Sequence, residues 1–166
     1  MPQSPVPQTS RPLPSPTRPD GSEQVTTYDL DQDGRIELWV YAAADDAGRI
    51  VRKELDMNGD GEADLRKEYD AAGVLTLESY DADFDGQPDA ISHYREGRLE
   101  TSERDEDGDG KRETRVVYGP DEEIVRVELD RNGDGRVDYR EEWENGAVVR
   151  RFVDDDGDGT LSPVTE

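Results

Sequence analysis

Short apolar runs, each about six residues long, recur between acidic segments along most of this chain. The runs contain pairs of β-branched residues, such as Val116-Val117 and Val148-Val149, which favour strands over helices. Two consecutive runs are usually separated by a short turn that contains glycine, such as Ala72-Gly73 or Asn145-Gly146. Two strands of this length around a glycine-containing turn are typical of a β-hairpin. The pattern therefore predicts a series of β-hairpins.

The apolar positions keep a fixed distance from the acidic segments. An aromatic residue lies 13 residues after the first aspartate of four segments, and an aliphatic residue lies six residues before the next segment. The aromatic residues are Tyr69, Tyr94, Tyr118 and Trp143, and the aliphatic residues are Ile50, Leu75, Leu99, Ile124 and Val148. In the first repeat the aromatic residue, Tyr41, comes one residue early. We expect a thin apolar stripe on one face of a sheet and no deep core on either face.

The acidic segments are six copies of one pattern, D-x-[D/N]-x-D-G. They begin at Asp29, Asp56, Asp81, Asp105, Asp130 and Asp154, so that successive copies start 27, 25, 24, 25 and 24 residues apart. Five copies have an acidic residue at the ninth position, where the sixth has Ser162. Side-chain oxygens at every second residue, followed by a glycine that permits a sharp reversal, are what a hard cation requires of a short loop. Six phased copies are poorly explained as ordinary turns rich in aspartate and glycine.

We therefore predict up to six bound Ca²⁺ ions, with side-chain ligands at positions 1, 3, 5 and 9 and a backbone carbonyl at position 7. The predicted side-chain ligands are Asp29, Asp31, Asp33 and Glu37; Asp56, Asn58, Asp60 and Asp64; Asp81, Asp83, Asp85 and Asp89; Asp105, Asp107, Asp109 and Glu113; Asp130, Asn132, Asp134 and Asp138; and Asp154, Asp156 and Asp158. Calcium is the first choice because cysteine is absent and every ligand is an oxygen, although Mn²⁺ or a lanthanide also fits such ligands.

The composition makes folding dependent on these ions. Hydrophobic residues form 31% of the chain, charged residues form 38%, and the net charge is -23. These values approach those of disordered chains, which have too little apolar surface to offset the entropy of ordering. The predicted ligands include 21 of the 43 carboxylates, and six divalent ions would change the net charge to -11. Folding and metal binding are therefore expected to be coupled.

The same charge excludes some partners. Nucleic acids and anionic membranes are poor partners for so acidic a chain, and no apolar segment is long enough to span a membrane. Residues 1–22 contain seven prolines and are expected to be a disordered linker, followed by a single repeat domain over residues 23–166. Residues 1–25 lack the pattern of a signal peptide. We nevertheless expect an extracellular, cell-surface or periplasmic location, where millimolar Ca²⁺ suits weak sites, with any signal or lipid anchor already removed.

The predicted fold class is all-β, with tandem repeats of about 25 residues in an antiparallel meander or solenoid-like array. A strand over residues 23–28 leads into the first loop, and the loops that join successive hairpins all lie along one edge. The last loop is expected to cap the array, because no strand pair follows it. The rival prediction is one helix per repeat, as in dockerin-like modules. Glycine-centred turns leave helical segments too short to be stable alone.

The loops resemble those of several calcium-binding families. The first six loop residues resemble an EF-hand, but position 12, which is a bidentate glutamate in an EF-hand, holds Val40, Lys67, Ser92, Val116, Glu141 and Thr165 here. With the ninth-position acid, the third loop (Asp81, Asp83, Asp85, Asp89) resembles the FG-GAP loops of integrin propellers. The hairpin segments Tyr69–Leu75 and Tyr118–Asp121 are similar to the YD repeats of Rhs-type proteins. Thrombospondin type 3 repeats share the acidic loops but have cysteines.

Over residues 23–162 the chain most resembles bacterial secreted or lipoprotein-type proteins built of tandem calcium loops and hairpins. That resemblance implies a structural or adhesive role, with a protein or a glycan at the cell surface as the candidate partner. Two alternatives are a calcium buffer or sensor, and a protein- or carbohydrate-binding surface that includes Trp39 and Trp143. We expect no enzymatic activity. The carboxylates are predicted to bind metal, and the sequence has no nucleophile motif that could act together with the single histidine, His93.

Overall fold

The structure is a computed structural model that describes residues 21–164 and divides the chain into two compact units, whose described parts are residues 21–97 and 98–164. Both units consist of β-strands, and no helix occurs among the described residues. The first unit contains β1 (Glu23–Tyr28), β2 (Leu38–Ala43), β3 (Asp46–Leu55), β4 (Leu65–Tyr69), β5 (Leu75–Tyr80) and β6 (Ala90–Arg95). The second contains β7 (Arg98–Arg104), β8 (Thr114–Tyr118), β9 (Ile124–Leu129), β10 (Tyr139–Glu144), β11 (Ala147–Val153) and β12 (Ser162–Pro163).

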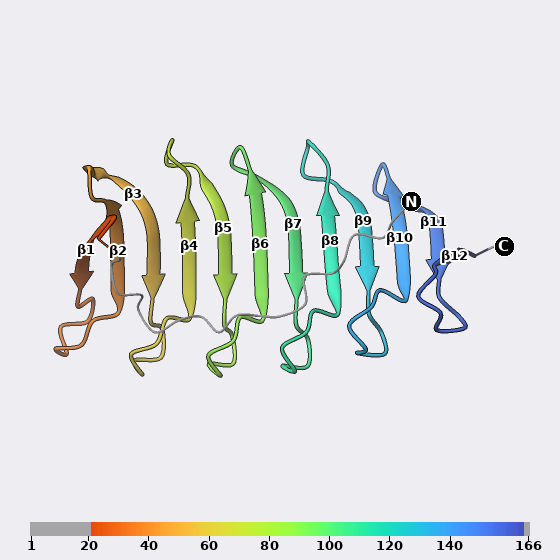
Figure 1. The fold of residues 1–166 in the computed structure, drawn as a ribbon, viewed down its shortest axis with the longest axis horizontal. Helices are drawn as coiled ribbons and strands as arrows, with labels where there is room; N and C mark the ends of the chain where they lie inside the picture. Colours follow the sequence, from red (N-terminus) through yellow and green to blue (C-terminus); the bar gives the residue numbers. More distant parts are fainter. Residues whose placement is uncertain (1–20, 165–166) are drawn as a thin grey trace. The chain divides into compact units, whose positions relative to one another are not determined.

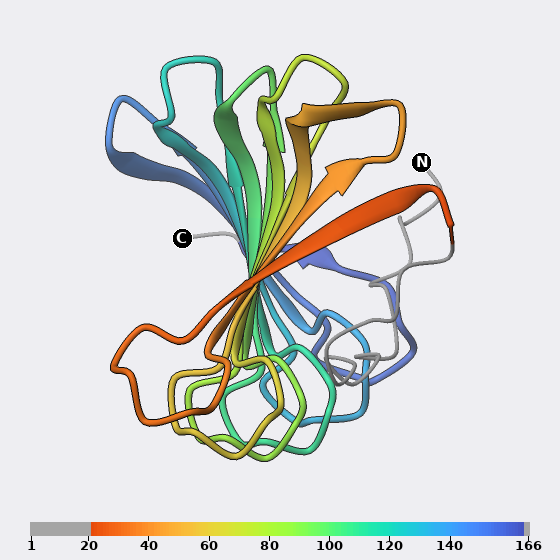
Figure 2. The ribbon, with the colours of Figure 1, turned by 90° about the vertical axis from the view of Figure 1, so that its left-hand side faces the viewer.

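Within each unit every strand pairs antiparallel with its neighbour in sequence. The acidic loops lie at one end of the strands and the tight turns lie at the other (Figure 1). Viewed along the sheet, the strands of each unit fan out, which is the twist expected of adjacent strands (Figure 2). The prediction of an all-β antiparallel meander is confirmed, the acidic segments join successive hairpins, and the helical alternative is wrong for the described residues.

Three hairpins share a bulge, and one of them has a two-residue turn. Asn145 and Gly146 both have positive φ, 52° and 76°, as a two-residue type I′ turn requires. In three hairpins the register shifts between the recurring aromatic residue and its predecessor, at Tyr69, Tyr118 and Trp143. A bulge increases the local twist and bends the strand. These three hairpins therefore bend at the same place in the repeat, whereas in the β2–β3 hairpin the register shifts after Tyr41.

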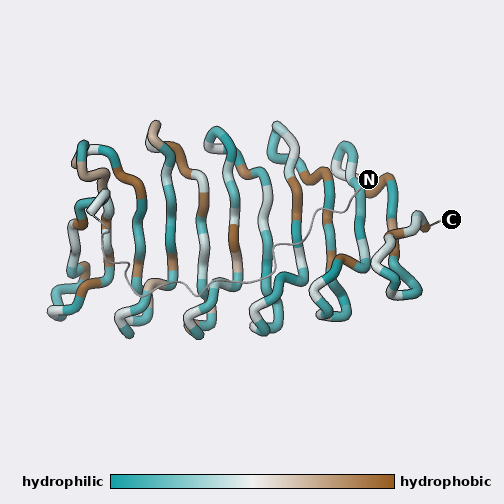
Figure 3. The backbone as a smooth tube through the Cα atoms, in the orientation of Figure 1, coloured by the Kyte–Doolittle hydropathy of each residue, from teal (hydrophilic) through white to brown (hydrophobic). Residues whose placement is uncertain are grey.

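Neither face of the sheets has a hydrophobic core. The buried apolar side chains of the described residues are Tyr41, Ala42, Ala43 and Ala63. Most strand residues are half-buried, and hydrophobic segments are short and scattered among the strands (Figure 3). The expected absence of a deep core is thus confirmed. Within the described chain, no helix has the length and apolar character needed to cross a bilayer.

Ion pairs take the place of apolar packing on one face. The Glu54 side chain is 1% exposed, and it accepts a hydrogen bond from the Tyr41 hydroxyl at 2.9 Å. The Arg52 Nε lies 3.2 Å from Glu54, and the Arg52 guanidinium lies 3.9 Å from the centre of the Tyr41 ring. Burial and the neighbouring Glu54 carboxylate both raise the pKa of Tyr41. A similar row occurs in the second unit, where Arg115 contacts Glu128.

The last loop leads into the single short strand β12, whose Ser162 and Pro163 pair with β11, and no strand pair follows this loop within the described residues, as predicted. The expected strand over residues 23–28 is present as β1. Almost all of the predicted linker, residues 1–22, lies outside the described residues, and the division into a linker and one repeat domain stays a prediction.

The buried Glu54 cluster should contribute more to stability than the exposed ion pairs do. Glu54→Ala leaves Arg52 and Arg66 facing a buried site without a carboxylate, and we expect it to lower the free energy of unfolding by about 3 kcal/mol. The control, Glu142→Ala, removes a more exposed partner of Arg150 and should cost less than about 1 kcal/mol. Urea unfolding of both variants checks this. Equal losses would contradict a special role for burial.

Candidate metal centres

Each acidic segment forms a loop that joins the end of one strand to the start of the next. We number the loops 1 to 6 along the chain and the residues of each loop from position 1, the first aspartate, to position 9. Loops 1 to 3 belong to the first unit and loops 4 to 6 belong to the second. The loops are residues 29–37, 56–64, 81–89, 105–113, 130–138 and 154–162. In loop 2, the Asp64 amide donates to the Leu55 carbonyl at 2.8 Å, which closes the loop at its base.

The position-1 carboxylate organises the loop by accepting two backbone hydrogen bonds. In loop 2, Asp56 Oδ1 accepts from the Gly59 amide at 2.6 Å and Asp56 Oδ2 accepts from the Gly61 amide at 2.8 Å. The corresponding bonds occur in all the other loops, at 2.6–2.9 Å, from Asp29, Asp81, Asp105, Asp130 and Asp154. The chain thus wraps around one carboxylate in each loop.

Positions 3, 5 and 9 repeat a second scheme. In every loop the position-3 oxygen accepts from the amide of position 5, and the position-5 carboxylate accepts from the amide of position 7. In loops 1 to 5 the position-9 carboxylate accepts from the amide of position 2, at 2.5–3.0 Å. These bonds use one oxygen of each carboxylate and hold the loop in a single conformation. The second carboxylate oxygen is thereby oriented for another partner.

The backbone reverses at two positions, of which sequence reasoning identified one. The position-6 glycine has positive φ in each loop, for example 93° at Gly61. Position 4 also has positive φ, and it is a glycine in four loops. The exceptions are Gln32 (66°) and Phe84 (65°), which adopt a conformation that ordinary residues disfavour. The recurrence of glycine at position 4 was a signal in the sequence that would have revealed this second reversal.

Several predicted ligand carboxylates are buried. Asp56, Asp64 and Asp81 are 4%, 2% and 1% exposed, and Asp105 and Asp130 are also buried. Burial raises the pKa of Asp64; backbone bonds from Met57 and Asn58 oppose this, and repulsion from Asp56 and Asp60 adds to it. The loop therefore keeps negative charge in a place where it is costly, and a bound cation would remove that cost.

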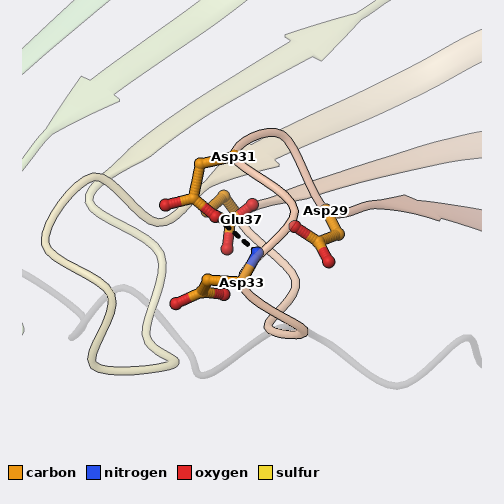
Figure 4. A group of neighbouring side chains, drawn as sticks. All are labelled: Asp29, Asp31, Asp33 and Glu37. Carbon is orange, nitrogen blue, oxygen red and sulfur yellow. Dashed lines mark hydrogen bonds between the residues drawn. The ribbon is translucent and has the colours of Figure 1, made fainter.

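Four loops bring their acids together in space. In loop 1, Asp29, Asp31, Asp33 and Glu37 surround a common space, and each offers an oxygen within 4.8 Å of the others (Figure 4). The same holds for Asp105, Asp107, Asp109 and Glu113; for Asp81, Asp83 and Asp85; and for Asp154, Asp156 and Asp158. The Oε1 atom of Glu113 is buried and has no hydrogen-bond partner, so it fits a metal ligand.

The other predicted ligands lie outside these groups. Loops 2 and 5 place asparagine at position 3, and their predicted ligands are Asp56, Asn58, Asp60 and Asp64, and Asp130, Asn132, Asp134 and Asp138. Asp89, at position 9 of loop 3, also lies outside its group. The hydrogen bonds of these loops nevertheless follow the common scheme. Metal ligation by the full set of residues stays a prediction.

Basic side chains form ion pairs with predicted ligands in three loops, which sequence reasoning missed. The longest is in loop 1, where Arg35 Nε lies 4.0 Å from Asp33 Oδ2. Arg131 Nε lies 2.6 Å from Asp138 Oδ1 in loop 5. Lys111 Nζ lies 3.0 Å from Asp109 Oδ2 in loop 4. Bonds from the Lys111 amide and ammonium lower the pKa of Asp109, and Asp109 in turn raises the pKa of Lys111. The loops therefore differ in the charge that surrounds otherwise similar ligands.

Position 12 lies in a strand rather than in the loop. Val40, Lys67, Ser92, Val116 and Glu141 belong to β2, β4, β6, β8 and β10. The one acid among them, Glu141, accepts hydrogen bonds from the Tyr139 hydroxyl at 2.8 Å and the Trp143 ring at 3.1 Å. The loops thus offer no bidentate glutamate of the kind that completes an EF-hand site.

Comparison with known proteins gives one family match, to the EF hand, over residues 128–145. That segment contains loop 5. No match was found among curated proteins. The EF-hand match and the acidic groups together indicate calcium binding by a calcium-loop repeat.

Three solved structures are similar in part. The chain is 14% identical to a structure of accessory secretory protein 1, 2 and 3 of Streptococcus pneumoniae, with a TM-score of 0.47, over 69% of this chain and 20% of that one. Two TarM structures, one of them from Staphylococcus aureus with fondaparinux, α-GlcNAc-glycerol and UDP, are each 9% identical over 78% of this chain. Their TM-scores are 0.40 and 0.36, and the match spans 21% and 19% of those chains. The chain thus spans about a fifth of the structures it matches.

Removing the buried charge of Asp64 should have opposite effects with and without metal. Because the folded pKa of Asp64 is raised, its ionisation destabilises metal-free folded protein as pH rises above about 4, the ordinary range of aspartate. Asp64→Asn keeps a side-chain acceptor for the Met57 amide, so at pH 7 in EDTA its melting temperature should exceed that of the wild type. The gain in melting temperature should vanish below about pH 4, where Asp64 of the wild type is protonated. At pH 7, Ca²⁺ should stabilise Asp64→Asn less than it stabilises the wild type.

The control is Asp121→Asn, which makes the same chemical change at an exposed turn residue outside the loops. Asp121→Asn should change the melting temperature much less than Asp64→Asn does, both in EDTA and in Ca²⁺. If Asp64→Asn lowered stability in EDTA, the charge of Asp64 would not be a cost to the metal-free fold.

Proposed function

We propose that this chain is a calcium-dependent β-hairpin repeat module that serves a structural or adhesive role outside the cell. Calcium binds in the DxDxDGxxD loops, neutralises them and stiffens the connections between successive hairpins. The observation that carries this proposal is the repetition of one hydrogen-bond scheme in six loops, which orients the oxygens of each loop before any ion binds.

The connection between loops supports a stiffening role. The position-1 amide of one loop donates to the position-9 carbonyl of the preceding loop, as from Asp56 to Glu37 and from Asp81 to Asp64, each at 2.8 Å. Asp130 donates in the same way to Glu113 at 2.8 Å in the second unit. A position-9 residue therefore offers its carboxylate to its own loop and its carbonyl to the next. An ion that fixes this residue also fixes the start of the following loop.

The chemistry of the loops favours calcium and a weak site. All side-chain donors are oxygens, and no bidentate glutamate closes the coordination sphere. Such sites are expected to have dissociation constants on the order of 10⁻⁴ M, within the range of extracellular calcium modules. This affinity supports a role where calcium is millimolar, and it argues for a structural module over an intracellular buffer. We assign no catalytic activity to the chain.

Circular dichroism tests the proposal directly. At a temperature above the melting temperature of the metal-free form, the protein in EDTA should lack most of its β signal, and Ca²⁺ titrated from micromolar to 10 mM should restore it with a midpoint between about 0.1 and 1 mM. Mg²⁺ at the same concentrations should restore much less, because Mg²⁺ is smaller and gives up its water reluctantly. A spectrum that Ca²⁺ leaves unchanged, together with no heat of binding by calorimetry, would overturn the proposal.

A single-site change tests the role of neighbouring loops. Asp60→Ala removes the position-5 ligand of loop 2, and it should abolish one site and loosen the hairpins on either side while distant repeats stay folded. At Ca²⁺ 100-fold above the dissociation constant, the loss should be about 2.7 kcal/mol. Hydrogen exchange locates the loosened strands. Glu62→Ala, at position 7 of the same loop, should leave the site intact, and loss of all structure in Asp60→Ala would contradict nearest-neighbour stabilisation.

A further inference from the structure

The side chain at position 7 of two loops reaches the next loop. In the first unit, Arg35 Nη1 donates to the Gly59 carbonyl at 2.8 Å. In the second unit, Lys111 Nζ donates to the Gly133 carbonyl at 2.6 Å. In both cases the acceptor is the position-4 carbonyl of the following loop. The recurrence of one contact in two separate units indicates a feature of the repeat rather than an accident of one loop.

Lys111 makes a second contact that Arg35 makes only weakly. The Lys111 ammonium lies 3.0 Å from Asp109 Oδ2, whereas the closest approach of Arg35 to Asp33 is 4.0 Å. Asp109 Oδ1 already accepts from the Lys111 amide at 2.9 Å. The oxygen that remains for a metal at position 5 of loop 4 is therefore the one that holds the ammonium.

We propose that Lys111 sets the calcium affinity of loop 4 by acting as a tethered cation, which competes with Ca²⁺ for Asp109 while the Gly133 carbonyl of loop 5 holds it in place. The proposal rests on the proposed function, because it concerns the same loops. Calcium at loop 4 must displace the ammonium from Asp109 Oδ2. An exposed ion pair is worth a few tenths to one kcal/mol, which corresponds to a loss of affinity of about two- to five-fold.

Loop 3 provides a natural comparison within the chain. Loops 3 and 4 both place carboxylates at positions 1, 3, 5 and 9, but position 7 is the uncharged Gln87 in loop 3. The position-1 carboxylates Asp81 and Asp105 accept the same two backbone bonds in the two loops. Loop 3 therefore serves as an internal reference, and its calcium midpoint should stay unchanged when Lys111 loses its charge, while the midpoint of loop 4 should fall.

Nuclear magnetic resonance can follow each loop separately during a Ca²⁺ titration of the full chain. The amides of Gly86 and Gly110, at position 6, donate to the position-1 carboxylates of loops 3 and 4 at 2.8 Å, so their resonances report filling of their own loop. Lys111→Met removes the ammonium and keeps an unbranched apolar side chain. We expect the midpoint at Gly110 to fall about two- to five-fold, with little change at Gly86.

The matched control is Arg104→Met, which removes one positive charge from the exposed residue directly before loop 4. It should move the Gly110 midpoint less than Lys111→Met does. Lys111→Arg keeps the charge but places it farther from the position-5 carboxylate, as Arg35 does in loop 1, so its midpoint should fall between those of the wild type and Lys111→Met. An unchanged midpoint in Lys111→Met, or equal shifts in Lys111→Met and Arg104→Met, would overturn the role of Lys111. If neither glycine responded to Ca²⁺ in the wild type, the proposed function itself would fail.

Discussion

The structure depends on the hydrogen bonds that the position-1 aspartate accepts from the backbone of its own loop. Both oxygens of Asp56 are used in this way, and the chain turns around them within six residues. The bonds replace water around the buried carboxylate, although they do not remove its charge. Each loop is therefore shaped by a carboxylate whose oxygens are fully hydrogen-bonded but whose negative charge is not neutralised. A hard cation supplies what is missing.

The strands and the loops treat charge differently, and this explains how so polar a chain folds. On the strands, arginine and glutamate alternate across neighbouring positions, as where Arg115 lies between Glu103 and Glu128. These charges neutralise one another without a bound ion. In the loops, acids greatly outnumber bases, so compaction there has to work against repulsion. The strand ladder accounts for the shape of each unit, and the charge of the loops is the reason to expect that its stability depends on ions.

Much of the fold follows from sequence because each feature rests on local chemistry. The period of the acidic segments, the glycine-containing turns and the recurring aromatic residues lead to the hairpins and to the ligand positions. Contacts between loops were not foreseen, because they depend on how far a side chain such as Lys111 extends across the strand spacing. The burial of Glu54 was also missed, because an acid on an open sheet is ordinarily exposed. Local rules place the ligands, whereas only the three-dimensional arrangement shows which charges meet.

The repeat links metal sites to one another through the backbone as well as through side chains. The carbonyl of Asp64 accepts from the Asp81 amide, and the carboxylate of Asp64 accepts from the Met57 amide. One residue thus belongs to two loops, and its position cannot change in one without effect on the other. In a sheet without a hydrophobic core, such links add to the strand ladders that join one hairpin to the next, as between β3 and β4. In the proposed function, an ion at a loop would strengthen the same connection.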